Sequence, residues 1–247
     1  MPAWGGVVIG ETETAVGAVQ ITGGDLSAGV VRLGTQSGGQ ASLWIRGGSL
    51  WASGLVVGEG GRLRIDGFHD GETYFSDLIL DENGDFSAEP GSAISVNRFC
   101  NRSSDPTAVS GMRNLWLDVC GTNVGVLAEV EASCLDVGAD VAGLFDGFAL
   151  RGLELGEEDV FRMIKLLDEF DNQLGSTGRE AMYVYDLIIH PDTQVDLTDA
   201  NLYYLNATIG ENVTFVGGEP TWVPEPACVG FFAPGAAWLL LGRRRRR

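Results

Sequence analysis

The first quarter of the chain alternates short apolar runs with glycine-rich turns. Runs this short are typical of β-strands rather than helices. Glycine provides the positive φ angles and the close backbone approach that tight turns need. We therefore expect strand-turn units between Val7 and Gly67, in the runs VVIG, VQITGG, VVRLG, SLWIRGG, LVVGEGG and RLRIDG.

These runs also repeat. The segment Ile21–Leu26 (ITGGDL) returns as Ile45–Leu50 (IRGGSL), and Ser42–Ile45 (SLWI) is echoed by Arg62–Ile65 (RLRI) at a similar separation. A short period of this kind, with several strands in each unit, is typical of a β-solenoid, in which neighbouring coils stack to bury their inner faces. We predict an all-β fold, a parallel β-helix (β-solenoid), right-handed because parallel crossover connections have that hand. A β-sandwich with similar hairpins is the alternative.

The same alternation of short strands and turns continues through the rest of the body. A polar, turn-rich stretch over 97–111 (NRFCNRSSDPTAVSG) interrupts it and predicts a loop or a lateral excursion. Further strands are expected at Leu78–Asp81, Ala93–Val96, Leu115–Asp118, Cys134–Val137, Tyr183–Ile189, Val195–Leu197 and Leu202–Leu205.

One segment, 157–170 (EEDVFRMIKLLDEF), fits two periods. Its first turn is acidic, and Val160, Ile164, Leu167 and Phe170 form an apolar helical stripe. The same residues also divide into two alternating rows, as in a strand. The local pattern alone favours a helix.

The C-terminal end has a different pattern. An uncharged segment, 227–242, precedes five consecutive arginines, Arg243, Arg244, Arg245, Arg246 and Arg247. A helix of this length reaches about 24 Å, short of the roughly 30 Å hydrocarbon core, so spanning would need local thinning or long flanking side chains. Arginine provides such flanks and holds this end on the cytoplasmic side. We expect a body over 1–218, a linker over 219–226, and a transmembrane helix with an arginine tail over 227–247. A buried helix with a solvated arginine run is the alternative.

A short motif lies directly before that segment and consists of Val223, Pro224, Glu225 and Pro226. The motif, the apolar segment and the terminal arginines together resemble the PEP-CTERM sorting signal of Gram-negative bacteria. The resemblance implies processing by an exosortase-type enzyme, export, anchoring by the C-terminus, and a final place at the cell surface or in the exopolysaccharide matrix. Residues 1–10 have neither a basic n-region nor a long apolar run, so we expect the signal peptide to lie upstream of this sequence.

The second half of the body is similar to the end region of large β-repeat surface proteins of planctomycete-type bacteria. The resemblance implies that 157–170 is extended, and it transfers no functional residue. It rests on Asp146–Leu150, Lys165–Asn172, Ala181–Val184, Val195–Leu197 and Asn201–Tyr204.

Composition narrows the possible partners and cofactors. With 34 acidic and 16 basic residues the net charge is −18, so nucleic acid is not expected as a partner. Exopolysaccharide is a candidate partner, with divalent cations as bridges. The four cysteines are Cys100, Cys120, Cys134 and Cys228, with at most one disulfide in the body. With only two histidines, a metal-thiolate site is not expected.

Calcium is the one cofactor that a motif suggests. Asp81, Asn83 and Asp85 have the alternating spacing of oxygen ligands, but Phe86 and Ser92 stand where an EF-hand needs Gly and Glu. A plain acidic turn is the stronger interpretation. No other cofactor is predicted.

Catalytic groups cannot be singled out by spacing. Acid pairs that could hydrolyse a glycosidic bond are present only in the sense that acids are abundant; examples are Asp136 with Asp140 and Asp196 with Asp199. The sequence His190-Pro191-Asp192 is explained by a turn between strands.

Two functional classes remain. The first is a non-enzymatic structural or adhesive protein of the cell surface or exopolysaccharide matrix. The alternative is a carbohydrate-active enzyme or lectin on a β-helix scaffold. Acids clustered in a groove beside aromatic platforms would favour the alternative, and acids scattered over a smooth stack would favour the first.

Overall fold

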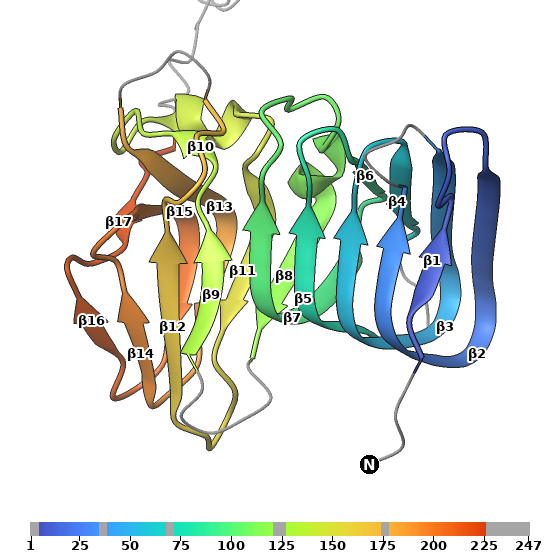
Figure 1. Cartoon of the computed structure of the whole chain (residues 1–247). Helices are drawn as coiled ribbons and strands as arrows, with labels where there is room; N and C mark the ends of the chain where they lie inside the picture. The colour runs from blue at the N-terminus through green and yellow to red at the C-terminus, as the bar shows by residue number, and fades with distance from the viewer. Residues whose placement is uncertain (1–4, 35–38, 68–71, 121–126, 174–177, 226–247) are drawn as a thin grey trace, which may run out of the picture.

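The computed structural model describes residues 5–34, 39–67, 72–120, 127–173 and 178–225. These residues form an all-β parallel β-solenoid of about eight coils, as predicted. The strands stack from β1 and β2 at one end to β16 and β17 at the other (Figure 1). The elements are β1 (Val7–Ile9), β2 (Val16–Leu33), β3 (Gln40–Val57), β4 (Gly61–Ile65), β5 (Thr73–Leu80), β6 (Asp85–Ala88), β7 (Ser92–Asn101), η1 (Ser110–Asn114), β8 (Leu115–Val119), β9 (Leu127–Glu131), β10 (Cys134–Leu135), η2 (Val141–Phe145), β11 (Leu150–Leu155), β12 (Arg162–Leu167), β13 (Glu180–Ile189), β14 (Thr193–Asp196), β15 (Asn201–Ile209), β16 (Thr214–Val216) and β17 (Thr221–Trp222).

The register of the first coils confirms the repeats read from the sequence. Ile21 of β2 pairs with Ile45 of β3, which pairs in turn with Ile65 of β4. The register shifts at the glycine pair that follows Thr22, where Gly48 has φ +74° and a Cβ on it would lie 2.3 Å from Gly24 O. Gly24 has the same φ of +74°, although a Cβ on it would meet nothing within 4 Å, so the left-handed backbone at Gly24 and Gly48 accounts for glycine at the second position of both GG pairs. The right-handed sense stays a prediction.

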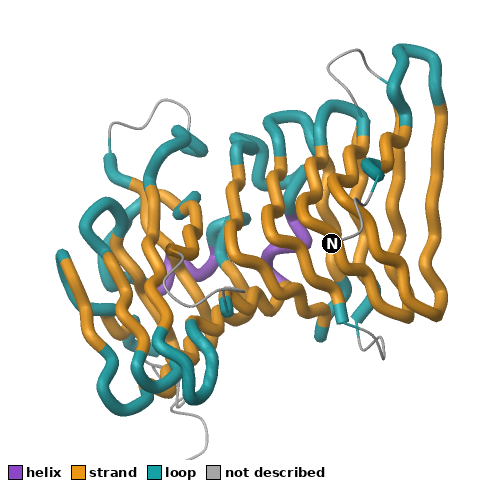
Figure 2. Tube along the Cα trace, turned by 60° about the horizontal axis from the view of Figure 1, so that its bottom comes forward, coloured by secondary structure: helices purple, strands orange, loops and turns teal. Residues whose placement is uncertain are grey.

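The ladders run through the whole body. One ladder runs from β2 and β3 through β5, β7, β8, β11 and β13 to β15. A neighbouring ladder includes β9, β12, β14 and β16 in succession. Loops lie along the edges of these ladders (Figure 2). The ambiguous segment 157–170 contributes strand β12, so the extended interpretation is confirmed and the helical one is wrong. Neighbouring coils dictate this outcome because β12 pairs with β9 on one side and β14 on the other.

The core is a continuous file of inward side chains. Leu33, Val57 and Leu80 are register partners on successive coils, and each has 0% exposure. Burial alternates along most strands, so each coil presents one apolar row inward and one polar row outward. No coil encloses a core by itself, so stability depends on contact between neighbours.

The excursion predicted over 97–111 begins only after Asn101, because residues 97–101 belong to strand β7, which pairs there with β5. The rest of it forms the loop before η1 and the start of η1, and η2 lies in a second excursion after β9. A buried polar cluster ties these loops to the stack. Glu180 Oε1 accepts the backbone N–H groups of Asn172 (2.6 Å) and Gln173 (2.9 Å), and Asn172 Nδ2 donates to the carbonyl of Ser103 (2.8 Å). The segment that precedes β13 is therefore bonded to the backbone of the first excursion.

The C-terminal prediction requires a correction. Within the described part of the chain, helical structure is limited to η1 and η2, and no helix is long and apolar enough to cross a membrane. The transmembrane helix expected over 227–242 is therefore not supported. The predicted segment itself lies outside the described residues.

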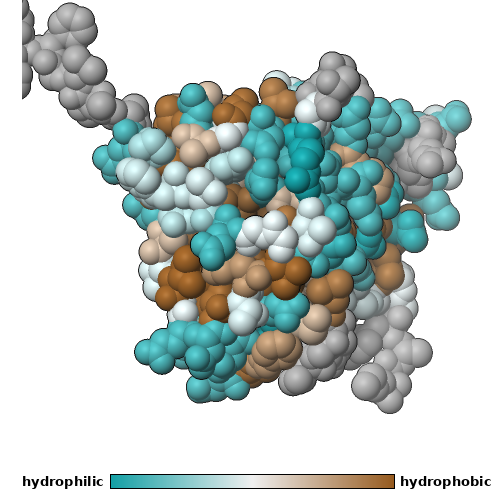
Figure 3. Space-filling view, turned by 90° about the vertical axis from the view of Figure 1, so that its left-hand side faces the viewer, coloured by the Kyte–Doolittle hydropathy of each residue, from teal (hydrophilic) through white to brown (hydrophobic). Residues whose placement is uncertain are grey.

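The stack also extends past Gly218, the end of the predicted body. Strand β17 pairs with β15, and the Val223 N–H donates to Tyr204 O (2.8 Å). Val223 is fully buried. This end of the solenoid shows apolar groups among polar ones (Figure 3), and Ile209, Val216 and Trp222 are its exposed large apolar side chains.

Candidate functional site

One outward-facing row of side chains crosses five successive strands of the long ladder. Register partners place Trp51 of β3, Tyr74 of β5, Ser95 of β7, Asp118 of β8 and Glu154 of β11 side by side. We call these five residues the outer row. They line an open groove of about 620 Å³, whose edge is formed by residues of the turns after β8, β11 and β13.

The first half of the outer row is aromatic. The rings of Trp51 and Tyr74 lie with their centroids 5.6 Å apart and their planes inclined by 38°. Trp51 is 43% exposed, and the Tyr74 hydroxyl accepts a hydrogen bond from Asn97 Nδ2 (2.9 Å). The two rings therefore offer adjacent apolar faces to a ligand in the groove.

The second half is polar. Ser95 Oγ donates to Asp118 Oδ2 (2.8 Å), while Glu154 Oε2 accepts from Trp116 Nε1 (3.1 Å). His190 Nε2 lies 2.6 Å from Glu154 Oε1, and since a carboxylate oxygen only accepts, this nitrogen carries the proton. Glu154 is therefore held in one orientation from both of its oxygens.

Gly152 makes room for this arrangement. A Cβ at this position would lie 2.3 Å from Cε3 of the Trp116 indole, so the ring crosses β11 where that strand has no side chain. Gly152 and Trp116 are register partners on the same two strands as the Glu154–Asp118 pair, and they precede it. The backbone thus positions the indole that orients Glu154.

Two residues that line the groove have raised pKa values. Burial raises the pKa of Asp118 to about 6, and the charge of Glu154 acts in the same direction. The hydrogen bond from Ser95 lowers this pKa. Burial also raises the pKa of the Cys120 thiol, to about 11. Cys120 is therefore a protonated thiol at neutral pH, whereas Asp118 can carry or release a proton there.

Arg162 lines the groove from β12, and its side chain is only 7% exposed. Its Nη2 donates to Glu157 Oε2. Its Nε and Nη1 are buried and have no hydrogen-bond partner among the described residues. Burying two unused donors costs free energy, and since neither atom is exposed to solvent, a ligand in the groove contacts neither of them without a shift of the side chain.

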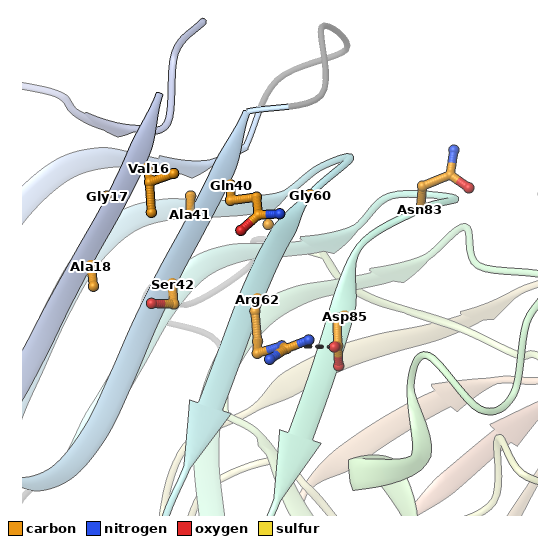
Figure 4. A pocket seen from close by; sticks show the side chains of 11 residues that line it. Val16, Gly17, Ala18, Gln40, Ala41, Ser42, Gly60, Arg62, Asn83 and Asp85 are labelled. Carbon is orange, nitrogen blue, oxygen red and sulfur yellow. Dashed lines mark hydrogen bonds and ion pairs between the residues drawn. The ribbon is translucent and has the colours of Figure 1, made fainter. Parts of the chain in front are cut away.

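A second depression, of about 340 Å³, lies over β2, β3, β4 and β6 (Figure 4). It includes part of the predicted calcium motif, but Asp85 points to Arg62 with Nε–Oδ2 at 2.8 Å, and Asp81 pairs with Arg102 (3.2 Å). An arginine balances each carboxylate, so the structure does not gather Asp81, Asn83 and Asp85 around a cation. Otherwise its lining residues are mostly small or apolar.

The acid pairs suggested by the sequence have local structural roles. Asp140 caps η2 by accepting from Ala142 N (2.8 Å), and Asp196 accepts from Thr198 N (2.9 Å). Asp136 accepts from Asn201 Nδ2 (2.7 Å), and Asp199 pairs with Lys165 (2.6 Å). None of these four acids lines the groove described above.

The turn interpretation of His190-Pro191-Asp192 is confirmed for its last two residues, and Asp192 has a positive φ of 56°. His190 itself, however, is a groove residue, which the sequence analysis missed. Glu154 and Asp118 were missed as well. A usable signal was the nearly constant spacing along the chain of Trp51, Tyr74, Ser95 and Asp118.

Within the motif that resembles a sorting signal, the structure describes three residues. Val223 is buried, and Pro224 and Glu225 are exposed directly after it. Pro226, Cys228 and the arginines 243–247 lie outside the described residues. Cys100, Cys120 and Cys134 are free thiols.

No protein-family model, curated protein or solved structure matches this chain. The fold and the groove alone therefore define its class: a parallel β-solenoid with an aromatic and acidic groove on its outer face.

Proposed function

We propose that this protein binds a polysaccharide chain along the groove, as an exported protein of the cell surface or exopolysaccharide matrix. The observation that carries the proposal is the outer row, in which two aromatic platforms and two carboxylates lie on neighbouring strands of one ladder. This is the arrangement expected of the carbohydrate-binding alternative rather than of a smooth structural stack.

The chemistry of the row suits sugars. The apolar faces of pyranose rings pack against exposed aromatic rings, and Trp51 and Tyr74 offer two such faces side by side. Carboxylates accept hydrogen bonds from sugar hydroxyls. Neighbouring strands are about 4.8 Å apart, a step comparable to the length of one sugar unit, so successive coils can contact successive sugars.

The charge of the groove narrows the class of glycan. Its lining includes five acids (Glu72, Asp118, Glu154, Glu157 and Glu158) against Arg162 and His190. Such a surface repels uronate chains and favours neutral or amino-bearing sugars. We therefore take the ligand to be a neutral or amino-sugar polysaccharide.

The sorting motif supports the proposed location. It resembles the signal that exosortase-type enzymes process, and Pro224 and Glu225 are exposed where the chain leaves the solenoid. Replacing Pro224, Glu225 and Pro226 by alanine in the native host should prevent maturation and release, measured by protein size and by fractionation. Normal release of this variant would remove the sorting part of the proposal.

Binding is tested with the full chain and a panel of soluble polysaccharides: a neutral glucan, chitosan and polygalacturonate. Trp51→Ala and Tyr74→Ala should each raise the Kd about tenfold, since about 1.4 kcal/mol corresponds to tenfold and an aromatic contact contributes about that much. Phe145→Ala is the matched control, because Phe145 is an exposed aromatic (64%) on η2 and does not line the groove. Absence of binding to every glycan, or binding unchanged in both groove variants, would refute the proposal.

A further inference from the structure

The polar half of the groove brings two carboxylates together on neighbouring strands. Asp118 of β8 and Glu154 of β11 are register partners, and both are half-buried on the outer face between fully buried neighbours. Adjacent strands are about 4.8 Å apart, so the two side chains leave the sheet at a spacing comparable to the roughly 5–5.5 Å between the carboxyl groups of retaining glycosidases.

The two carboxylates have different surroundings. Glu154 is fixed by Trp116 Nε1 and His190 Nε2, at 3.1 and 2.6 Å. Asp118 accepts from Ser95 Oγ (2.8 Å), and burial raises its pKa to about 6. One carboxylate is therefore held in a fixed orientation, while the other is suited to carry a proton near neutral pH.

Arg162 places a buried positive charge beside the same groove. Its side chain is 7% exposed and lines the same groove, and its buried Nε and Nη1 donate to no group among the described residues. Neither atom is exposed to solvent, so a bound sugar would accept from them only after the side chain turns toward the groove.

We propose that the groove hydrolyses the glycan that it binds, with Asp118 as the acid–base residue and Glu154 as the nucleophile. This inference rests on the proposed glycan binding. It adds a reaction and names the bond that is broken.

The reaction takes place in two balanced steps. A Glu154 oxygen attacks the anomeric carbon and forms a glycosyl ester, while the glycosidic C–O bond breaks and its electron pair goes to the leaving oxygen, which takes the proton of Asp118. Water then attacks the same carbon and gives a proton to Asp118, and the ester C–O bond breaks to restore the Glu154 carboxylate. The net reaction consumes one water and yields a new reducing end with its anomeric configuration retained.

The two aromatic rings indicate where sugar units bind relative to the bond that is broken. Trp51 and Tyr74 lie on the coils before the carboxyl pair, so sugar units bind there on one side of the broken bond. As argued from charge, a neutral or amino-sugar polysaccharide is the substrate.

The test incubates the full chain with the neutral glucan, chitosan and polygalacturonate, and measures new reducing ends and the anomeric configuration of the first product by NMR. Asp118→Asn and Glu154→Gln should lower the rate by about 10²–10⁴-fold, the usual contribution of such groups, while the Kd stays within a few-fold. The rate of the unmodified protein should fall as the pH rises through about 6, where Asp118 loses its proton. Glu211→Gln, an exposed acid outside the groove, is the matched control and should leave the rate unchanged.

The outcomes separate the two proposals. Binding without new reducing ends on any glycan would overturn hydrolysis and leave glycan binding intact, whereas absence of binding would overturn both. Inversion of configuration would overturn the role of Glu154 as nucleophile, and preferred cleavage of polygalacturonate would overturn the charge argument. Because the NMR assay uses the unmodified protein, it decides the stereochemistry even if a variant fails to fold.

Discussion

Replacing Glu180 by glutamine should stabilise this protein at pH 8 and destabilise it slightly, by about 1 kcal/mol, near pH 4.5. Glu180 is 3% exposed, and burial raises its pKa from 4.5 to about 8, with the charges of Asp168 and Glu131 acting in the same direction. The hydrogen bonds from Asn172 and Gln173 oppose this rise. The folded state therefore prefers the protonated side chain.

The sign of the pH dependence follows from proton linkage. Between pH 4.5 and 8 the folded state keeps a proton on Glu180 that the unfolded state has lost, so the free energy of unfolding decreases as pH rises. Each pKa unit corresponds to about 1.4 kcal/mol, which makes the loss on the order of 4 kcal/mol across this range. Glu131, whose pKa burial raises to about 7, adds a loss of the same sign.

In the glutamine variant the side-chain oxygen can still accept from Asn172 N and Gln173 N. The new amide group replaces Oε2, which is buried without a hydrogen-bond partner among the described residues, at a cost of about 1 kcal/mol. The net gain at pH 8 is therefore about 3 kcal/mol, or roughly 6–12 °C in Tm for a chain of this size.

The assay is thermal unfolding at pH 4.5 and at pH 8, followed by circular dichroism. Glu219→Gln is the control, since Glu219 is exposed and its substitution should leave the difference between the two pH values as in the unmodified protein. The reasoning fails if the Tm difference between Glu180→Gln and the unmodified protein is the same at both pH values.

Three further predictions concern packing. Gly152→Ala should destabilise the fold by about 1–3 kcal/mol, because its Cβ would collide with the Trp116 ring, and it should also weaken glycan binding; unchanged unfolding in urea would contradict this. Phe86→Ala removes a fully buried ring from β6 and should cost about 3–5 kcal/mol in the same assay, with an unchanged m-value; a loss below about 1 kcal/mol would contradict the described core. Val223→Asp should speed amide exchange of Trp222 while the Tm changes by only a few degrees, because among the described strands β17 pairs with β15 alone; unchanged exchange would show that Val223 does not hold β17.

The sequence predicts the part of the fold that repeats at a nearly constant period. Ile21, Ile45 and Ile65 recur along the chain in equivalent apolar runs and are register partners in the structure. The strand at β12 was not evident from its own residues, because its pattern also fits a helix and only pairing with β9 and β14 decides it. Resemblance anticipated this strand, whereas periodicity did not.

The groove was harder to predict for the same reason. Asp118 follows Ser95 at the ordinary spacing of one coil, but Glu154 lies much farther along the chain from Asp118, because the second excursion lies between their strands. A search of the sequence for residues at a constant spacing therefore finds Asp118 but not Glu154. His190 was harder still to predict, because it contacts Glu154 from the turn after β13, and a turn alone already explains the residues there.

The unequal spacing of the outer row has an evolutionary consequence. Each coil contributes one residue to the row, and the connections between coils leave the ladder at its edges, so an excursion can lengthen without moving the residues on either side of it. A substitution on one coil alters a single subsite, and duplication of a coil would add one. The specificity of such a groove can therefore diversify coil by coil while the fold that supports it stays the same.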